Sequence, residues 1–129
     1  MIYIVQNIFP ILAATMAGLA IGLAWVRASG GQRPSARVLL VGALAEFWLA
    51  AILAGALILA PSQAGAWTMA LGSAFIIWVG FVMPAFVVTL GAGGVKAGRI
   101  ASVAFHWLVV MLAQAAIMQA IGVAAPPAA

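Results

Sequence analysis

Four long apolar stretches occupy most of this chain, and the connections between them are short. The stretches cover residues 2–26, 38–60, 66–90 and 100–123. Each is close to the roughly 20 residues that an α-helix needs to cross about 30 Å of hydrocarbon. Strands are disfavoured, because the runs are continuous rather than alternating and a membrane sheet would have to close into a barrel. The sequence therefore predicts an all-α, polytopic membrane protein with four transmembrane helices in an antiparallel bundle.

The composition supports this class. Hydrophobic residues make up 68% of the 129 positions and charged residues only 5%, which excludes a soluble domain. The formal charge of +4 comes from scattered basic groups that form no basic face with interleaved aromatic residues, so no nucleic acid is expected as a partner. The absence of cysteine removes disulfides and thiolate metal sites. No linker divides the chain, and we predict a single transmembrane domain over residues 1–129.

The basic residues predict the topology. All five lysine and arginine residues fall in the connections Arg27–Arg37 and Gly91–Arg99, while the connection Pro61–Gly65 and both termini have none. Loops rich in Lys and Arg stay on the cytoplasmic side, so both termini are predicted to be non-cytoplasmic. The first stretch lacks the basic beginning of a signal peptide, and we expect it to remain as a helix. The tail, residues 124–129, is expected to be frayed.

Glu46 is the only acidic residue and lies inside the second apolar stretch. It follows Arg37 by nine residues, which places it about 13 Å above the basic interface and near the midplane of the bilayer. Gly42 and Ala50 share its helical face, which is therefore suited to close helix contact. Glu46 is expected to point into the bundle and to be protonated, hydrogen-bonded or paired. A structural role and the handling of protons or cations both remain open.

His106 is the only histidine and is the expected partner of Glu46, directly or through one water. It lies about 10 Å above the same interface, at a similar depth. A hydrogen-bonded core histidine is the alternative. Ser102, His106 and Trp107 also resemble the bacteriochlorophyll-ligating pattern of light-harvesting helices, so bacteriochlorophyll at His106 is a further alternative, although those chains cross the membrane once. No other cofactor is predicted, and no metal site, because the ligands are too few.

Small residues and a proline mark two further helices. Ala14, Gly18 and Gly22 form one face of the first helix and allow another backbone to approach closely. Whether that face serves the bundle or a partner chain stays open. In the third helix Pro84 is predicted to kink or loosen one turn, because it lacks an N–H and its ring clashes with the preceding turn.

Four larger side chains have expected roles. Trp25 lies at a span end and fits interfacial anchoring. Trp107 lies too deep for that and is expected to pack against helices, lipid or a bound hydrophobic molecule. Gln114 and Gln119 do not share the helical face of His106, and we expect them to form hydrogen bonds between helices.

The second half of the chain resembles a known family. Ala74–Leu90 (AFIIWVGFVMPAFVVTL), a short turn and Ile100–Gly122 with His106 are similar to the C-terminal half of the bacterial domain of unknown function (DUF) 1761 family of small four-helix membrane proteins. Gly22–Trp25 resembles the Gly-x-x-Trp that closes that family's first helix, although Val26 stands where an aromatic residue is common. The resemblance implies a four-helix protein of the bacterial cytoplasmic (inner) membrane, without an established activity.

Two classes of function follow, and neither is enzymatic, because one Glu, one His and no Cys give no nucleophile-and-base set. The first is a structural or accessory subunit that docks onto a larger membrane complex, with other membrane subunits or a second copy as partners within the lipid bilayer. The alternative is a small proton-coupled transporter that uses Glu46 with His106. The small multidrug resistance family offers an analogy, with its essential glutamate in the first helix. A pigment-associated subunit with His106 as ligand is a lesser alternative.

Overall fold

The computed structural model describes residues 2–127 and places most of them in helices. In chain order these are α1 (Ile2–Gln6), α2 (Ile8–Ala28), α3 (Ala36–Leu59), α4 (Ala66–Ile77), the π-helical turn η1 (Trp78–Val82), α5 (Met83–Ala92) and α6 (Ala97–Ile121). No strand occurs between residues 2 and 127. Four segments are long and apolar enough to cross a membrane, namely α2, α3, the continuous run from α4 to α5, and α6. The predicted all-α fold is confirmed, and the chain is a multi-pass membrane protein.

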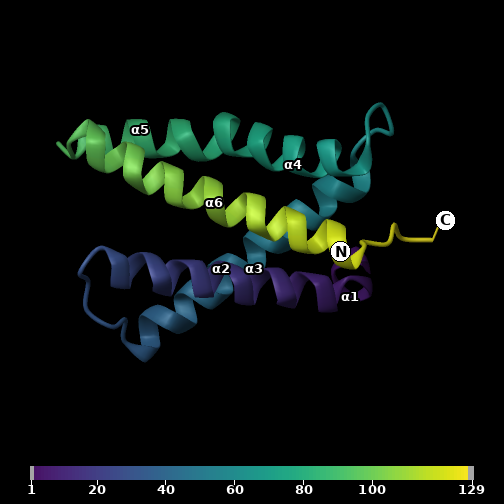
Figure 1. Cartoon of the computed structure of the whole chain (residues 1–129), viewed down its shortest axis with the longest axis horizontal. Coiled ribbons are helices and arrows are strands. Elements are labelled where there is room, and N and C mark those ends of the chain that lie inside the picture. Colours follow the sequence, from purple (N-terminus) through teal and green to yellow (C-terminus); the bar gives the residue numbers. More distant parts are fainter. Residues whose placement is uncertain (1, 128–129) are drawn as a thin grey trace.

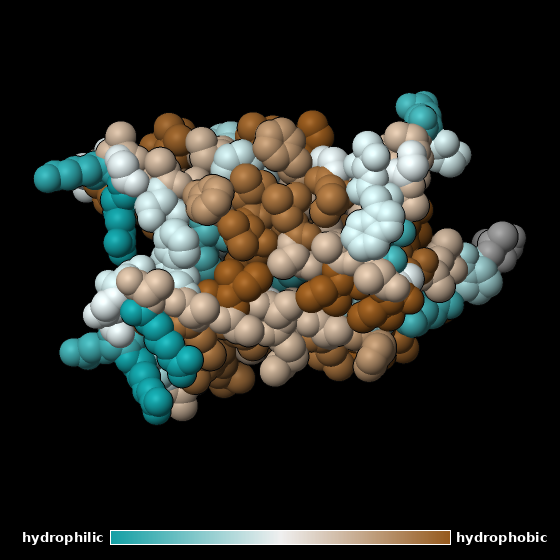
Figure 2. Space-filling view, in the orientation of Figure 1, coloured by the Kyte–Doolittle hydropathy of each residue, from teal (hydrophilic) through white to brown (hydrophobic). Residues whose placement is uncertain are grey.

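Successive spans run in opposite directions (Figure 1). Both chain ends lie at one end of the molecule, and the two basic connections, α2 to α3 and α5 to α6, lie at the other. Figure 2 shows the most hydrophilic residues at the ends, mainly the basic one, and a mostly hydrophobic middle. This arrangement agrees with a membrane across the middle. The side of the membrane that each end faces stays a prediction from the basic residues.

Both basic connections begin with the same backbone turn. After α2, Gly30 adopts a positive φ of 69°, and the N–H of Gly31 donates to the carbonyl of Val26 at 2.9 Å. After α5, Gly94 has a φ of 76°, and the N–H of Val95 donates back to the helix at 2.9 Å. This is the Schellman motif, which favours glycine because a left-handed residue there has no Cβ to clash. The repeated cap ends both helices sharply at the basic end.

Asn7 divides the first predicted helix and ties it to the tail. Its side chain is 2% exposed, and its Nδ2 donates to the carbonyl of Ala124 at 2.9 Å. The N–H of Ala124 donates in return to Asn7 Oδ1 at 2.7 Å. The expected fraying of residues 124–129 is therefore wrong at Ala124, because two hydrogen bonds hold it; residues 128–129 lie outside the described part of the chain.

The core is built of small side chains, and large ones face outward. Six of its members are alanines and the rest are aliphatic or methionine: Ile11, Ala14, Ala50, Ala51, Leu53, Ala54, Ala74, Met111, Ala115 and Met118. Without a hydrophobic force between helices in lipid, small residues favour association because backbones come close and pack well. Exposed side chains such as Phe81 and Trp48 are then positioned to meet lipid tails. The core lies between α2, α3, α4 and α6.

The third span contains a wider turn directly before Pro84. In η1 the N–H of Met83 bonds to the carbonyl of Trp78, five residues back instead of four. Proline would clash with the carbonyl four residues before it and cannot donate the hydrogen bond of a regular α-helical turn. A π-helical turn widens the helix at such a position and relieves this clash. Trp78 also donates from Nε1 to the carbonyl of Ala104 at 2.8 Å, which fastens this turn to α6. The sequence predicted a kinked or loosened turn at Pro84, and the structure has η1 there.

Candidate functional site

The single carboxylate of the chain is held by an amide on another helix. Glu46 of α3 is 6% exposed, and Gln114 of α6 is fully buried. Gln114 Nε2 donates to Glu46 Oε2 at 2.7 Å and, more weakly, to the main-chain carbonyl of Glu46 at 3.4 Å. A polar pair of this kind joins two helices in the hydrocarbon region, where an unpartnered polar group is costly.

Gly18 makes room for this pair. A Cβ built on Gly18 would collide with Glu46 Oε2, and it would lie 2.7 Å from Glu46 Cδ and 3.0 Å from Gln114 Nε2. Ala14, one turn earlier, is fully buried in the core. The small face of α2, whose role the sequence left open, therefore serves the chain's own bundle at Ala14 and Gly18.

An open-sided cavity of about 290 Å³ lies between α2, α3 and α6. Its walls include three glycines, two tryptophans, the acid and the histidine, namely Gly18, Gly22, Gly42, Trp25, Trp107, Glu46 and His106. We call it the Glu46 cavity. Pro34 and Val38 also line it, so it extends from Glu46 to the basic end of the molecule. Towards the other end the fully buried Ile11, Leu53 and Met118 belong to the closed core.

The small residues on the Glu46 face of α3 divide between this cavity and the core. Gly42 lines the cavity, and a Cβ built there would lie 3.8 Å from Leu19 Cδ2. Ala50 is fully buried among the core side chains. The expected inward orientation of Glu46 thus agrees with its surroundings.

The expected direct pairing of Glu46 with His106 is wrong, because within residues 2–127 the carboxylate's side-chain partner is Gln114. The imidazole instead packs against Trp25 and Trp107, with ring centroids 5.0 Å and 5.8 Å away. The prediction placed both side chains by counting residues from the basic end of their helices. Such a count does not give the position across the bundle, because α3 crosses it obliquely (Figure 1). Both side chains line the same cavity, so a bridge through one water stays a prediction.

Two buried polar atoms of the site have no partner within the described part of the chain, His106 Nδ1 and Gln114 Oε1. Such atoms are rare in folded proteins and call for an explanation. An amide rotated by half a turn would present Oε1 to Glu46 and could accept a hydrogen bond from a protonated carboxyl group. Gln114 can therefore serve Glu46 in both protonation states.

Sequence reasoning missed two members of the site. Gln114 was expected only to bond between helices, which it does, without Glu46 as the named partner. Trp25 was expected at the interface but lines the cavity and covers His106. The signal available in the sequence for Gln114 was a polar side chain inside an apolar stretch. Within residues 2–127 no three His, Cys, Asp or Glu side chains come together to hold a metal ion.

Comparisons with protein-family models, curated proteins and solved structures found no match for this chain. The resemblance to the DUF1761 family therefore stays a prediction.

Proposed function

We propose that this chain is a small proton-coupled membrane carrier, in which Glu46 binds either a proton or a lipophilic cation. The observation that supports this is the position of a lone carboxylate at the wall of an open-sided cavity, deep in an apolar span. From the sequence, an accessory subunit came first and the carrier second. The cavity favours the carrier over the accessory subunit. A hydrogen bond that only joins two helices does not need a cavity beside the carboxylate.

The chemistry of the cavity points to the class of substrate. One carboxylate supplies a single negative charge, and the rings of Trp25 and Trp107 supply faces that attract cations. The volume of about 290 Å³ lies just below the roughly 300–1,000 Å³ typical of ligand pockets, which favours a small ligand. A small aromatic or alkyl ammonium ion fits these properties, whereas an anion would be repelled by the carboxylate.

The coupling follows from the shared site. A proton and a monovalent cation compete for the same carboxylate, so binding of the cation releases the proton to water. Gln114 stabilises the pair in either state, because its amide can donate to the carboxylate or accept from the acid. Release on the far side requires the closed core to open near Ile11 and Met118, as in alternating access.

The test is transport by the purified chain in liposomes. Uptake of radiolabelled benzyltrimethylammonium is measured under an imposed pH gradient, because a quaternary ion cannot cross as a neutral base. Glu46→Gln should abolish gradient-driven uptake, and Gln119→Leu, outside the cavity on α6, should retain it. Equal uptake by the native chain and Glu46→Gln, or none above empty liposomes, overturns the proposal.

The accessory role remains a second candidate because of the third span. Of its residues only Ala70 and Ala74 are buried in the described part of the chain, and side chains such as Trp67, Ile76 and Phe81 are exposed. This exposed face is available to lipid or to another protein. Purification in mild detergent with a stoichiometric second polypeptide would support this role.

Pigment binding at His106 has less support, since Trp25 and Trp107 already pack against the ring. Visible absorbance in the purified protein would support it. No candidate requires an enzymatic activity.

A further inference from the structure

We propose that the basic end of α2 and α3 binds an anionic phospholipid, with its phosphate on Arg27 and Arg33 and one acyl chain in the groove between the two helices. The arginine pocket shares Leu23, Val26, Pro34 and Leu39 with the Glu46 cavity, but Arg27 and Arg33 do not line that cavity. The proposal does not depend on transport.

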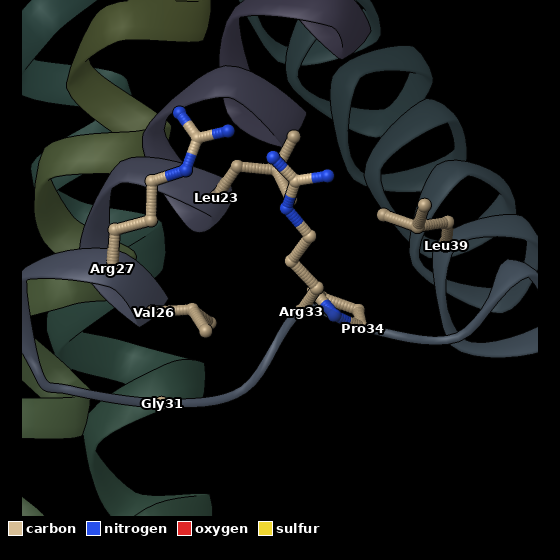
Figure 3. A pocket seen from close by; sticks show the side chains of 7 residues that line it. All are labelled: Leu23, Val26, Arg27, Gly31, Arg33, Pro34 and Leu39. Carbon is tan, nitrogen blue, oxygen red and sulfur yellow. The ribbon is translucent and has the colours of Figure 1, made fainter.

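Two guanidinium groups line one pocket of about 250 Å³ (Figure 3). Arg27 lies in the last turn of α2, and Arg33 follows in the connection to α3. Figure 3 shows both side chains extending away from the connecting loop. The loop is packed closely on the helix, since a Cβ built on Gly31 would lie 2.9 Å from Val26 Cγ1. The fold thus holds two positive charges at the same opening.

No acidic group in the described part of the chain balances the charge of this pocket. Between residues 2 and 127 neither guanidinium makes a hydrogen bond to a side chain or an ion pair. The only acid, Glu46, is engaged by Gln114 inside the bundle. Two like charges lining one pocket repel each other and favour an anion between them. Phosphate is the suited anion, because a planar guanidinium donates two parallel hydrogen bonds to its oxygens.

An apolar groove lies next to this pocket. It has a volume of about 530 Å³, and its walls include Met16, Leu19, Ala20, Leu23, Leu39 and Ala43. Leu23 and Leu39 line both the groove and the arginine pocket, so the two adjoin. Ala20 and Ala43 contribute only methyl groups to it. A free phosphate ion would occupy only the arginine pocket and would leave the groove to bulk lipid tails. A phospholipid fills the pocket and the groove together.

The predicted topology places the pocket in the leaflet where anionic lipids concentrate. The basic connections are expected on the cytoplasmic side, whose surface is negative and attracts juxtamembrane Lys and Arg. Basic pockets between membrane helices on that side are known to hold anionic head groups. Position, charge and shape therefore agree on one occupant.

The experiment measures lipid binding to the full chain in detergent by native mass spectrometry. Phosphatidylglycerol is titrated against phosphatidylcholine with the same acyl chains. Arg27→Gln with Arg33→Gln should weaken phosphatidylglycerol binding by about tenfold or more, since each basic group contributes to the attraction. The matched control, Lys96→Gln with Arg99→Gln, makes the same change of charge at the other basic loop and should leave binding within about twofold of the native chain.

Two further arms separate the lipid from other anions. Ala43→Phe fills the groove without changing charge and should also weaken phosphatidylglycerol binding. Inorganic phosphate should not displace the lipid. Equal losses in both arginine and control pairs would mean general attraction to charge and overturn the site. Unchanged binding in Ala43→Phe together with displacement by phosphate would mean a free-anion site instead. If the glutamine pair fails to fold, Arg27→Lys with Arg33→Lys keeps the charge, and a loss of binding there still supports the bidentate contact.

Discussion

Gln114 Nε2 of α6 lies 2.7 Å from Glu46 Oε2 of α3, and the backbone of α2 at Gly18 passes directly beside both groups. Three helices therefore meet at one polar contact within an apolar bundle. The contact constrains how the helices are rotated, because only one face of each can present these residues at once. It also leaves Glu46 at the wall of a cavity.

Gly18→Ala should destabilise the protein, since the added methyl group would collide with the Glu46 carboxylate. Overpacking of this kind costs about 1–3 kcal/mol. Gly22→Ala, one turn later on α2, is the matched control because a Cβ there meets nothing within 4 Å. Thermal unfolding in detergent micelles measures both. Equal melting temperatures for the two variants would mean that the close approach at Gly18 is absent in the membrane.

Glu46→Gln should be more stable than Glu46→Ala, because an amide still pairs with Gln114 and alanine leaves that amide without a partner. A double-mutant cycle with Gln114→Ala should give a coupling of about 0.6–1.7 kcal/mol, the range for hydrogen bonds between membrane helices. Denaturant unfolding of the four proteins supplies the cycle. A coupling near zero would contradict the contact.

Asn7→Ala should release the segment after α6, because it removes both hydrogen bonds to Ala124. Hydrogen exchange of the C-terminal peptide should then become faster, while the peptides of α3 stay unchanged. Gln6→Ala, on the neighbouring exposed position, should leave the exchange as in the native chain. Protection that survives in Asn7→Ala would show that other contacts hold the tail.

Trp78→Phe should lower stability more than Trp48→Phe. The first change removes the hydrogen bond of 2.8 Å from the indole to the Ala104 carbonyl, whereas the side chain of Trp48 is 51% exposed and faces outward. We expect a difference of about 0.6–1.7 kcal/mol, as for other interhelical hydrogen bonds in membranes. Thermal unfolding of the two variants checks it, and an inverted order would count against the fastening of η1 to α6.

The topology can be tested with single cysteines, because the native chain has none. Gln32→Cys and Ala97→Cys lie at the basic end and should be protected from an impermeant thiol reagent added outside intact cells. Ser62→Cys, in the connection at the other end, should react. Labelling of Gln32→Cys from outside would reverse the predicted orientation.

The number, length and order of the spans could be predicted from the sequence alone, because apolar runs of this length have few alternatives to membrane helices. The ends of the helices were displaced by a few residues. Ser35 starts α3 earlier than expected, since its Oγ accepts from the N–H of Val38 at 3.4 Å. Glu46 was identified as the residue of interest from the cost of placing a carboxylate in hydrocarbon.

The partner of Glu46 was decided only by the tertiary structure. The helices are apolar all round, so no polar face indicates how each is rotated or where two of them cross. Residue counting favoured His106, while the oblique crossing of α3 and α6 brings Gln114 to the acid. The bond between Asn7 and Ala124 joins positions 117 residues apart. Contacts of this kind depend on the relative placement of whole helices. Small-residue faces such as that of Ala14 and Gly18 indicate which side of a helix packs, but not which residues of two helices meet.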